Sequence, residues 1–167
     1  ELQVRLRAGE RILSLESRDL TIFALAKLAE SRDPDTGAHL ERIREYCRTM
    51  VDELGRSDSP PPEIDGDFEQ MIYLTSPLHD IGKVGIPDSI LLKRGKLTAG
   101  EWEIMKTHAE IGAETLRSVI RVESAPSYLE MGLDIALCHH EKWDGSGYPA
   151  GLSGPAIPLA ARILALA

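Results

Sequence analysis

Five histidines are the side chains of this sequence best suited to chemistry, and three of them stand in adjacent pairs, either with another candidate ligand or with each other. They are His39, His79, His108, His139 and His140. His79 is followed directly by Asp80. A carboxylate at that place can bridge two cations while the imidazole ligates one, and two metals about 3.5–4 Å apart suit in-line displacement at phosphorus. The alternative is that Asp80 only caps a helix or forms a local ion pair.

His139 and His140 supply two more imidazoles at the end of a predicted helix. Histidines at that place also complement the helix dipole, which is the plain structural interpretation. The segment that follows, Glu141–Pro149, carries two glycines before Tyr148. Glycine lets the backbone pass close to a ligand, and the Tyr148 ring can pack against a base or a sugar. A metal site beside a nucleotide pocket is therefore the functional hypothesis.

The elements that must position these residues are predicted to be helices throughout. No segment shows convincing period-two alternation, and aromatic residues make up only 5% of the chain, so the sequence favours helices over strands. Thr98 and Glu101 match a capping box. The expected fold is an all-α bundle of about six to seven helices, covering roughly residues 2–29, 40–54, 67–78, 98–107, 108–119, 126–140 and a stretch from 159.

The first predicted helix has two interpretations. Leu6, Leu13 and Leu20 recur every seven residues, as in a coiled-coil linker, but Gly9 and Glu16 interrupt the alternate heptad positions. A helix that faces the core, with Leu20 and Leu28 among its apolar positions, explains the pattern equally well. We expect residues 1–19 to form a linker helix and residues 20–167 to form the domain.

Composition and charge narrow the class of protein. Hydrophobic residues make up 43% of the 167 residues, which indicates a globular domain. The formal charge is −8, with 27 acidic and 19 basic side chains, so duplex nucleic acid is not the expected partner. A phosphate ester could bind only where cations reverse the local field. Cys47 and Cys138 form no paired motif, and no apolar run is long enough to cross a membrane. A reduced, cytoplasmic protein is expected.

Taken together, the motifs resemble those of one family, the HD-GYP domains, a subgroup of the HD superfamily of metal-dependent phosphohydrolases. His79-Asp80-Ile81-Gly82-Lys83 looks like the family's HDxGK motif. The other matching segments are Asp35-Thr36-Gly37-Ala38-His39, His108-Ala109-Glu110-Ile111-Gly112, His139-His140-Glu141 and Gly147-Tyr148-Pro149. The motifs stand in the family's order between about residue 20 and the last residue, and they use all five histidines.

The resemblance implies a metal centre and a substrate pocket. The implied metal ligands are His39, His79, Asp80, His108, His139 and His140, with Asp35 as the ligand of a third metal. Asp80 is implied to bridge two metals, and Lys83 to lie over the phosphate. The residues implied to shape the nucleotide pocket are Lys83, Gly145, Gly147, Tyr148 and Pro149. Two or three divalent ions are implied, with iron favoured and manganese the alternative.

The function implied by the resemblance is hydrolysis of cyclic di-GMP to linear pGpG, or onward to GMP, in a bacterial signalling protein. The family pattern has a further Asp ligand just beyond the segment 162–167, so a domain cut short at this end is expected. An upstream receiver or sensory domain, a homodimer and a diguanylate cyclase domain are the expected partners. The competing hypotheses are an HD hydrolase of another nucleotide, and a catalytically silent module that binds cyclic di-GMP or a partner protein.

Overall fold

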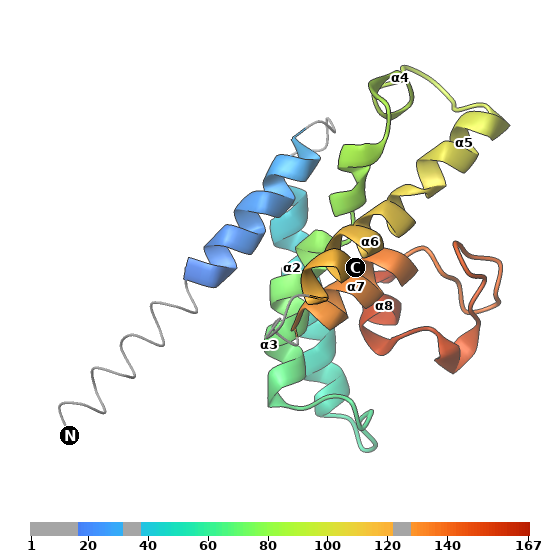
Figure 1. Ribbon diagram of the computed structural model, residues 1–167. Coiled ribbons are helices and arrows are strands. Elements are labelled where there is room, and N and C mark those ends of the chain that lie inside the picture. Colours follow the sequence, from blue (N-terminus) through green and yellow to red (C-terminus); the bar gives the residue numbers. More distant parts are fainter. Residues whose placement is uncertain (1–16, 32–37, 122–127) are drawn as a thin grey trace.

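The computed structural model of the chain describes residues 17–31, 38–121 and 128–167. Over these residues the protein is a bundle of helices without a strand, as predicted (Figure 1). After a helix over residues 17–30, the elements are α2 (Ala38–Gly55), α3 (Gly66–Thr75), the 3-10 turns η1 (Ser76–Leu78) and η2 (Ile81–Gly85), α4 (Asp88–Leu91), α5 (Ala99–Lys106), α6 (His108–Ile120), α7 (Tyr128–Cys138), η3 (Gly154–Ala156) and α8 (Leu159–Leu164).

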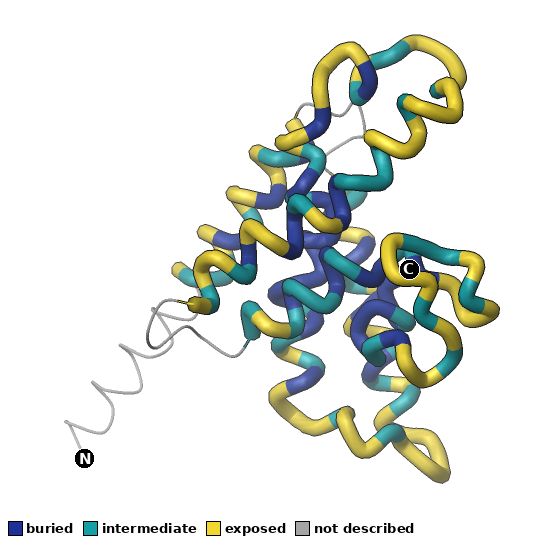
Figure 2. Tube along the Cα trace, turned by 45° about the vertical axis from the view of Figure 1, so that its right-hand side comes forward, coloured by how far each residue is buried: buried dark blue, intermediate teal, exposed yellow. Residues whose placement is uncertain are grey.

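Two apolar clusters hold the bundle together, and the buried positions run through its centre (Figure 2). One cluster joins α2, α3, α7 and α8 around Cys47, Ile72 and Ile135, each with less than 1% of its surface exposed. The other joins the helix over residues 17–30 to α2, η1, α6 and α7 around Leu40 and Leu78. Removing apolar surface from water drives this packing, and it fixes the ends of the helices relative to one another.

The helix over residues 17–30 contacts the bundle through a different face from the one predicted. Ile22 and Ala26 are buried, whereas Leu20 and Leu28 are 70% and 68% exposed. The expectation that Leu20 and Leu28 face the core was therefore wrong, because the inward face follows the four-residue spacing of Ile22 and Ala26. The first two leucines of the heptad lie outside the described residues, and so does most of the predicted linker.

The predicted boundaries of two other helices can be compared with the structure. The Thr98 capping box is present with both of its hydrogen bonds, and it opens α5 as predicted. The helix expected over residues 67–78 is shorter, since α3 ends at Thr75 and the chain continues as η1. Pro77 explains the change, because it has no N–H to donate and its ring clashes with the preceding turn of an α-helix. The predicted start of the helix over residues 126–140 lies outside the described residues.

The turn η2 lies against α6 so closely that only glycine fits at one position. A Cβ atom added to Gly82 would lie 1.9 Å from the carbonyl oxygen of His108 and 2.5 Å from the amide nitrogen of Gly112. This approach places the residues just before η2 next to the first turn of α6. The fold thus joins two of the segments that carry the predicted ligands.

Both cysteines are buried and form no disulfide, as the sequence predicted. Burial raises the pKa of the Cys47 thiol to about 12, so it stays protonated and packs as a small apolar side chain. Within the described ranges, no helix is both long and apolar enough to span a bilayer.

Candidate metal centre

The predicted ligands that the structure describes all lie at the ends of helices or in breaks between them. His39 is the second residue of α2, and His108 is the first residue of α6. His139 and His140 follow directly after the end of α7. His79 and Asp80 occupy the break between η1 and η2, so both side chains of this adjacent pair can face one site. A continuous helix would have turned them about 100° apart.

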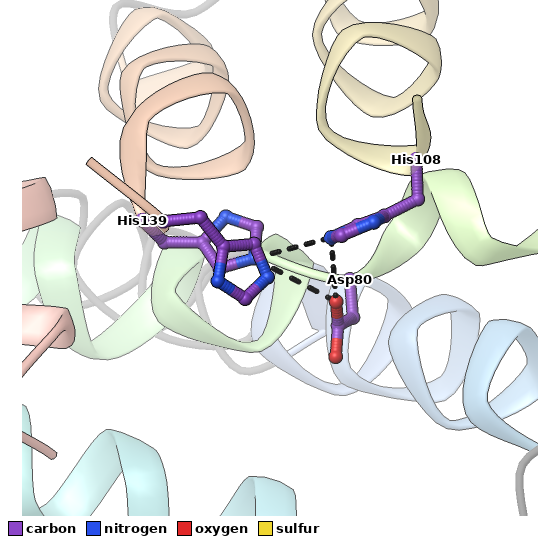
Figure 3. Close-up of side chains that lie close together, drawn as sticks. Asp80, His108 and His139 are labelled. Carbon is purple, nitrogen blue, oxygen red and sulfur yellow. Dashed lines mark hydrogen bonds and ion pairs between the residues drawn. The ribbon is translucent and has the colours of Figure 1, made fainter. Parts of the chain in front are cut away.

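Four of these residues meet in one cluster, which is Asp80, His108, His139 and His140. One ligand atom from each lies within 4.8 Å of the others. The Oδ1 atom of Asp80 is 3.3 Å from Nε2 of His108 and 3.7 Å from Nε2 of His139 (Figure 3). The two Nε2 atoms are 3.4 Å apart. Asp80, His108 and His139 are buried, and His140 is partly buried.

Backbone carbonyls decide which ring nitrogen of these histidines carries a proton. Nδ1 of His108 lies 2.7 Å from the carbonyl oxygen of Met105, and Nδ1 of His139 lies 3.1 Å from that of Ile135. A carbonyl oxygen only accepts, so Nδ1 must be the donor in each ring. In a neutral ring the proton is then on Nδ1, and the lone pair of Nε2 points toward Asp80. Metal-binding histidines in proteins are held in the same way.

This arrangement leaves acceptors facing acceptors. The Nε2 lone pairs of His108 and His139 face each other and a carboxylate oxygen, with 3.3–3.7 Å between the atoms. Without a proton or a cation between them, the three atoms repel one another in a buried place. A divalent cation satisfies all three, and imidazole with carboxylate is an ordinary ligand set for zinc, iron or manganese. The residues present therefore fit a bound metal ion.

The protonation states of His108, His140 and Asp80 agree with this fit. Burial lowers the pKa of His108, and burial together with the neighbouring imidazoles of His139 and His108 lowers the pKa of His140 to about 3. Both rings are therefore neutral near pH 7, which is the form that ligates metal. Burial alone would raise the pKa of Asp80, but His79, the adjacent imidazole hydrogen bonds and Lys83 hold it well below its usual value. Asp80 is thus an anion at the centre of the cluster.

A second cluster adjoins the first through the other oxygen of Asp80. Ligand atoms of Glu30, His39 and His79 all lie within 4.8 Å of one another. Nε2 of His79 is 3.2 Å from Oδ2 of Asp80, and Nδ1 of His79 is 3.0 Å from the carbonyl oxygen of Ser76. The two oxygens of Asp80 therefore face two different groups of ligands. This is the geometry that a bridging carboxylate requires.

Lys83 borders the same carboxylate. Its Nζ atom is 2.9 Å from Oδ2 of Asp80, and its side chain is 20% exposed. Lys83 therefore stands at the edge of the metal centre, with part of its side chain exposed. It is the cationic side chain expected there from the sequence.

The loop after His140 is folded back against the metal centre. Tyr148 stacks on His140, with ring centroids 4.6 Å apart and planes inclined by 25°. The amide of Tyr148 donates to the carbonyl oxygen of His140, and the amide of Ala150 donates to the carboxylate of Glu141 at 2.8 Å. A Cβ atom on Gly147 would lie 2.4 Å from the Cα atom of Glu141. Gly147 thus permits a close approach between two parts of this chain.

The remaining predicted pocket residues lie on the same loop. Gly145 has φ near +80°, a conformation that glycine adopts without strain. Pro149 follows a cis peptide bond and is exposed. Asp35, the predicted ligand of a third metal, lies outside the described residues.

The family assignment follows from this arrangement together with a family model described as "HD domain", which matches residues 24–167. The chain belongs to the HD domain family. The resemblance drawn from the sequence motifs is thereby confirmed, and the all-helical fold agrees with it.

Several characterised relatives resemble this HD domain over most of its length. A cyclic di-GMP phosphodiesterase of Vibrio cholerae is 48% identical over 151 residues, which is 90% of this chain and 31% of the relative. A cyclic di-GMP phosphodiesterase of Thermotoga maritima is 45% identical over 86% of this chain and 35% of the relative. A 3′3′-cGAMP-specific phosphodiesterase of Vibrio cholerae is 46% identical over 87% of this chain and 26% of the relative. The chain thus spans about a third of the length of these proteins.

Two residues at the site were given no role of their own by the sequence analysis. Glu30 looks like a surface residue of a charged helix, yet only 7% of its surface is exposed. Its place could have been read from its spacing, since Ile22, Ala26 and Glu30 follow each other every four residues on the inward face. Glu141 is 4% exposed and fastens the loop at Ala150. In the sequence it was named only as the last residue of the motif His139-His140-Glu141.

Proposed function

We propose that this HD domain hydrolyses cyclic di-GMP with the help of bound divalent cations, releasing linear pGpG and in a further step GMP. The observation that carries the proposal is the group of Nε2 lone pairs converging on one oxygen of Asp80, with a second group of ligands at its other oxygen. Relatives named cyclic di-GMP phosphodiesterases support the substrate. Iron is the preferred metal in this proposal, and manganese the alternative.

Two metal subsites are assigned to the two clusters. Asp80, His108, His139 and His140 hold one cation, and Glu30, His39 and His79 hold a second, with Asp80 shared between them. Asp35 remains the proposed ligand of a third. The bound ions supply Lewis acidity, which lowers the pKa of water and stabilises charge on phosphate oxygens.

The chain's own residues bind and orient the phosphodiester. Lys83 offers a positive charge at the mouth of the site and offsets the negative charge that develops on the phosphate. Burial raises the pKa of Tyr148 to about 12, with Asp80 adding to the shift, so its hydroxyl keeps its proton at neutral pH and can donate to a phosphate or ribose oxygen. Gly145, Gly147 and Pro149 set the path of the loop that carries Tyr148.

A second candidate substrate is 3′3′-cGAMP. The relative of that specificity is 46% identical, close to the value for the cyclic di-GMP enzymes. Both molecules are cyclic dinucleotides joined by 3′–5′ phosphodiesters, so the same metal centre serves either. Only contacts to the bases can make the enzyme prefer one of these two substrates over the other.

The wider role follows as part of the proposal. The domain acts as the cytoplasmic output of a bacterial signalling protein, coupled to a receiver or sensory domain and able to pair with a diguanylate cyclase domain or with a second copy. A silent module that binds cyclic di-GMP without cleaving it is the competing function. The retained ligand set favours the enzyme, since binding alone has no need for every imidazole.

The test measures metal content and product release with the whole protein. We expect turnover of cyclic di-GMP or 3′3′-cGAMP in the wild type, and loss of turnover with reduced metal content in His79→Ala and Asp80→Ala. Arg56→Ala, a change at an exposed residue directly after the end of α2, is the control and should behave as the wild type. Unaltered turnover in either ligand variant refutes the assigned site. Binding without cleavage in the wild type supports the silent module.

A further inference from the structure

An exposed tryptophan stands beside the loop that borders the metal centre. Trp102 is 46% exposed, and its ring contacts Tyr148 edge-to-face, with centroids 6.2 Å apart and planes inclined by 84°. An indole kept at the surface forgoes the free energy of burial, which is large for this side chain. Packing alone therefore does not explain why a tryptophan stands next to Tyr148 at the surface.

Tyr148 connects this tryptophan to the metal ligands. One face of the Tyr148 ring is stacked on His140, which belongs to the first cluster of ligands. The Tyr148 ring is thus stacked on His140 and also makes a T-shaped contact with Trp102. Three rings in succession lead outward from the metal centre to the surface. A ligand with a phosphate at the metals and an aromatic group a few bonds away would follow this line.

The helix that carries Trp102 is fixed relative to the metal centre. The capping box at Thr98 holds the first turn of α5. At the other end, the carbonyl oxygen of Met105 accepts from Nδ1 of His108, so the last turn of α5 is hydrogen-bonded to a ligand of the metal site. Trp102 therefore stands on a rigid element. Trp102 belongs to this helix and not to the loop that carries Tyr148.

The same face of α5 also carries a cation. Lys106 lies one turn after Trp102, and its Nζ atom is 5.7 Å from the centroid of the Tyr148 ring. It is paired with Glu103 at 2.8 Å and partly buried. A phosphodiester or an electron-rich base at this edge would meet a positive charge beside two aromatic rings. This combination is common where proteins hold single-stranded nucleotides.

We propose that Trp102 stacks on a purine base of the cyclic dinucleotide, with Lys106 beside it, and so acts as a substrate-binding residue on α5. The inference rests on the proposed function, because it takes its ligand from it. Stacking of a base on an aromatic side chain contributes about 1–3 kcal/mol and tolerates any base. Trp102 therefore contributes to affinity for cyclic di-GMP and for 3′3′-cGAMP alike, and it does not distinguish between them.

The kinetic test compares Trp102→Ala and Trp102→Phe with the wild type in the whole protein. For Trp102→Ala we expect KM for the cyclic dinucleotide to rise roughly 5- to 150-fold, with little change in kcat. This range of KM is the stacking energy of about 1–3 kcal/mol expressed as an equilibrium ratio. Trp102→Phe should recover much of the loss. Ile104→Ala is the matched control, since Ile104 is similarly exposed on α5 but two residues away and on another face. An unchanged KM in Trp102→Ala overturns the inference.

A binding test separates this inference from the proposed function. The chain has two tryptophans, so Trp143→Phe leaves Trp102 as the only indole. Cyclic di-GMP and 3′3′-cGAMP should quench its fluorescence, and inorganic phosphate should not. Quenching in a protein that shows no turnover would support base binding at Trp102 and contradict the proposed phosphodiesterase activity. Turnover without quenching would support the phosphodiesterase activity and contradict base binding at Trp102.

Discussion

Replacement of Gly82 by alanine is a sharp test of how the fold builds the metal centre. The added Cβ atom would lie 1.9 Å from the carbonyl oxygen of His108, against ordinary contacts of 3.4 Å and more, so η2 and α6 have to separate by about 1.5 Å. Asp80 lies two residues before Gly82, and the obstructing oxygen belongs to a proposed metal ligand. The 3.3 Å distance between Asp80 and His108 must therefore change as well.

The size of the effect can be estimated in two ways. Overpacking of this kind costs about 1–3 kcal/mol, and a domain of this size loses about 2–4 °C of Tm for each kcal/mol. We therefore expect Tm of Gly82→Ala to fall by about 2–12 °C. A displacement near 1 Å at a reacting site reduces turnover about 10²-fold, so the variant should also be nearly inactive and hold less metal.

The matched control is Gly100→Ala. Gly100 lies in α5 and no atom stands within 4 Å of an added Cβ, so the variant should keep its activity and its Tm should stay the same or rise slightly. Differential scanning calorimetry, metal analysis and turnover would be measured on both variants. A Gly82→Ala protein with the Tm, metal content and turnover of the wild type would show that the close approach of η2 and α6 is not what positions the ligands.

Two further changes test single residues. Glu30→Gln should lower the metal content, by up to one equivalent, because a neutral amide is a much poorer ligand than a carboxylate. Glu41→Gln on the exposed face of α2 is the control. Equal metal content in the two variants would show that Glu30 is not a metal ligand. Burial, followed by the nearby charge of Glu130, raises the pKa of Asp134, so this carboxylate destabilises the folded state once the pH exceeds its ordinary value of 3.8. Asp134→Asn should therefore increase the free energy of unfolding in urea at pH 7, with the gain disappearing below that pH; a gain that persists in acid would contradict the reasoning.

Much of the architecture could be predicted from local patterns. The Thr98 capping box and the apolar spacing of α2 are properties of short segments, and both appear in the structure as predicted. The end of α3 was missed because apolar spacing continues past Thr75, whereas Pro77 forces a 3-10 turn. The inward face of the helix over residues 17–30 was missed because Leu20 and Leu28 were expected to mark its apolar face, whereas the bundle buries Ile22 and Ala26.

The candidate site was predictable to the extent that its ligands stand in contiguous motifs. His79 with Asp80, and His139 with His140, could be recognised because each pair is adjacent in the sequence. Glu30 could not be recognised in that way, since it is brought to His39 and His79 only by the packing of its helix. Trp102 likewise lies far from Tyr148 in sequence, and its contact depends on the orientation of α5.

The central claim is that the oxygens of Asp80 and the surrounding imidazoles hold metal ions. The most direct measurement is anomalous diffraction from crystals of the protein loaded with manganese or iron. The account predicts a peak at ligand distance, roughly 2.0–2.3 Å, from Oδ1 of Asp80 and Nε2 of His108 and His139, with a second peak beside Oδ2 and His79. Crystals that hold the metal elsewhere, with no anomalous density at Asp80, would contradict it.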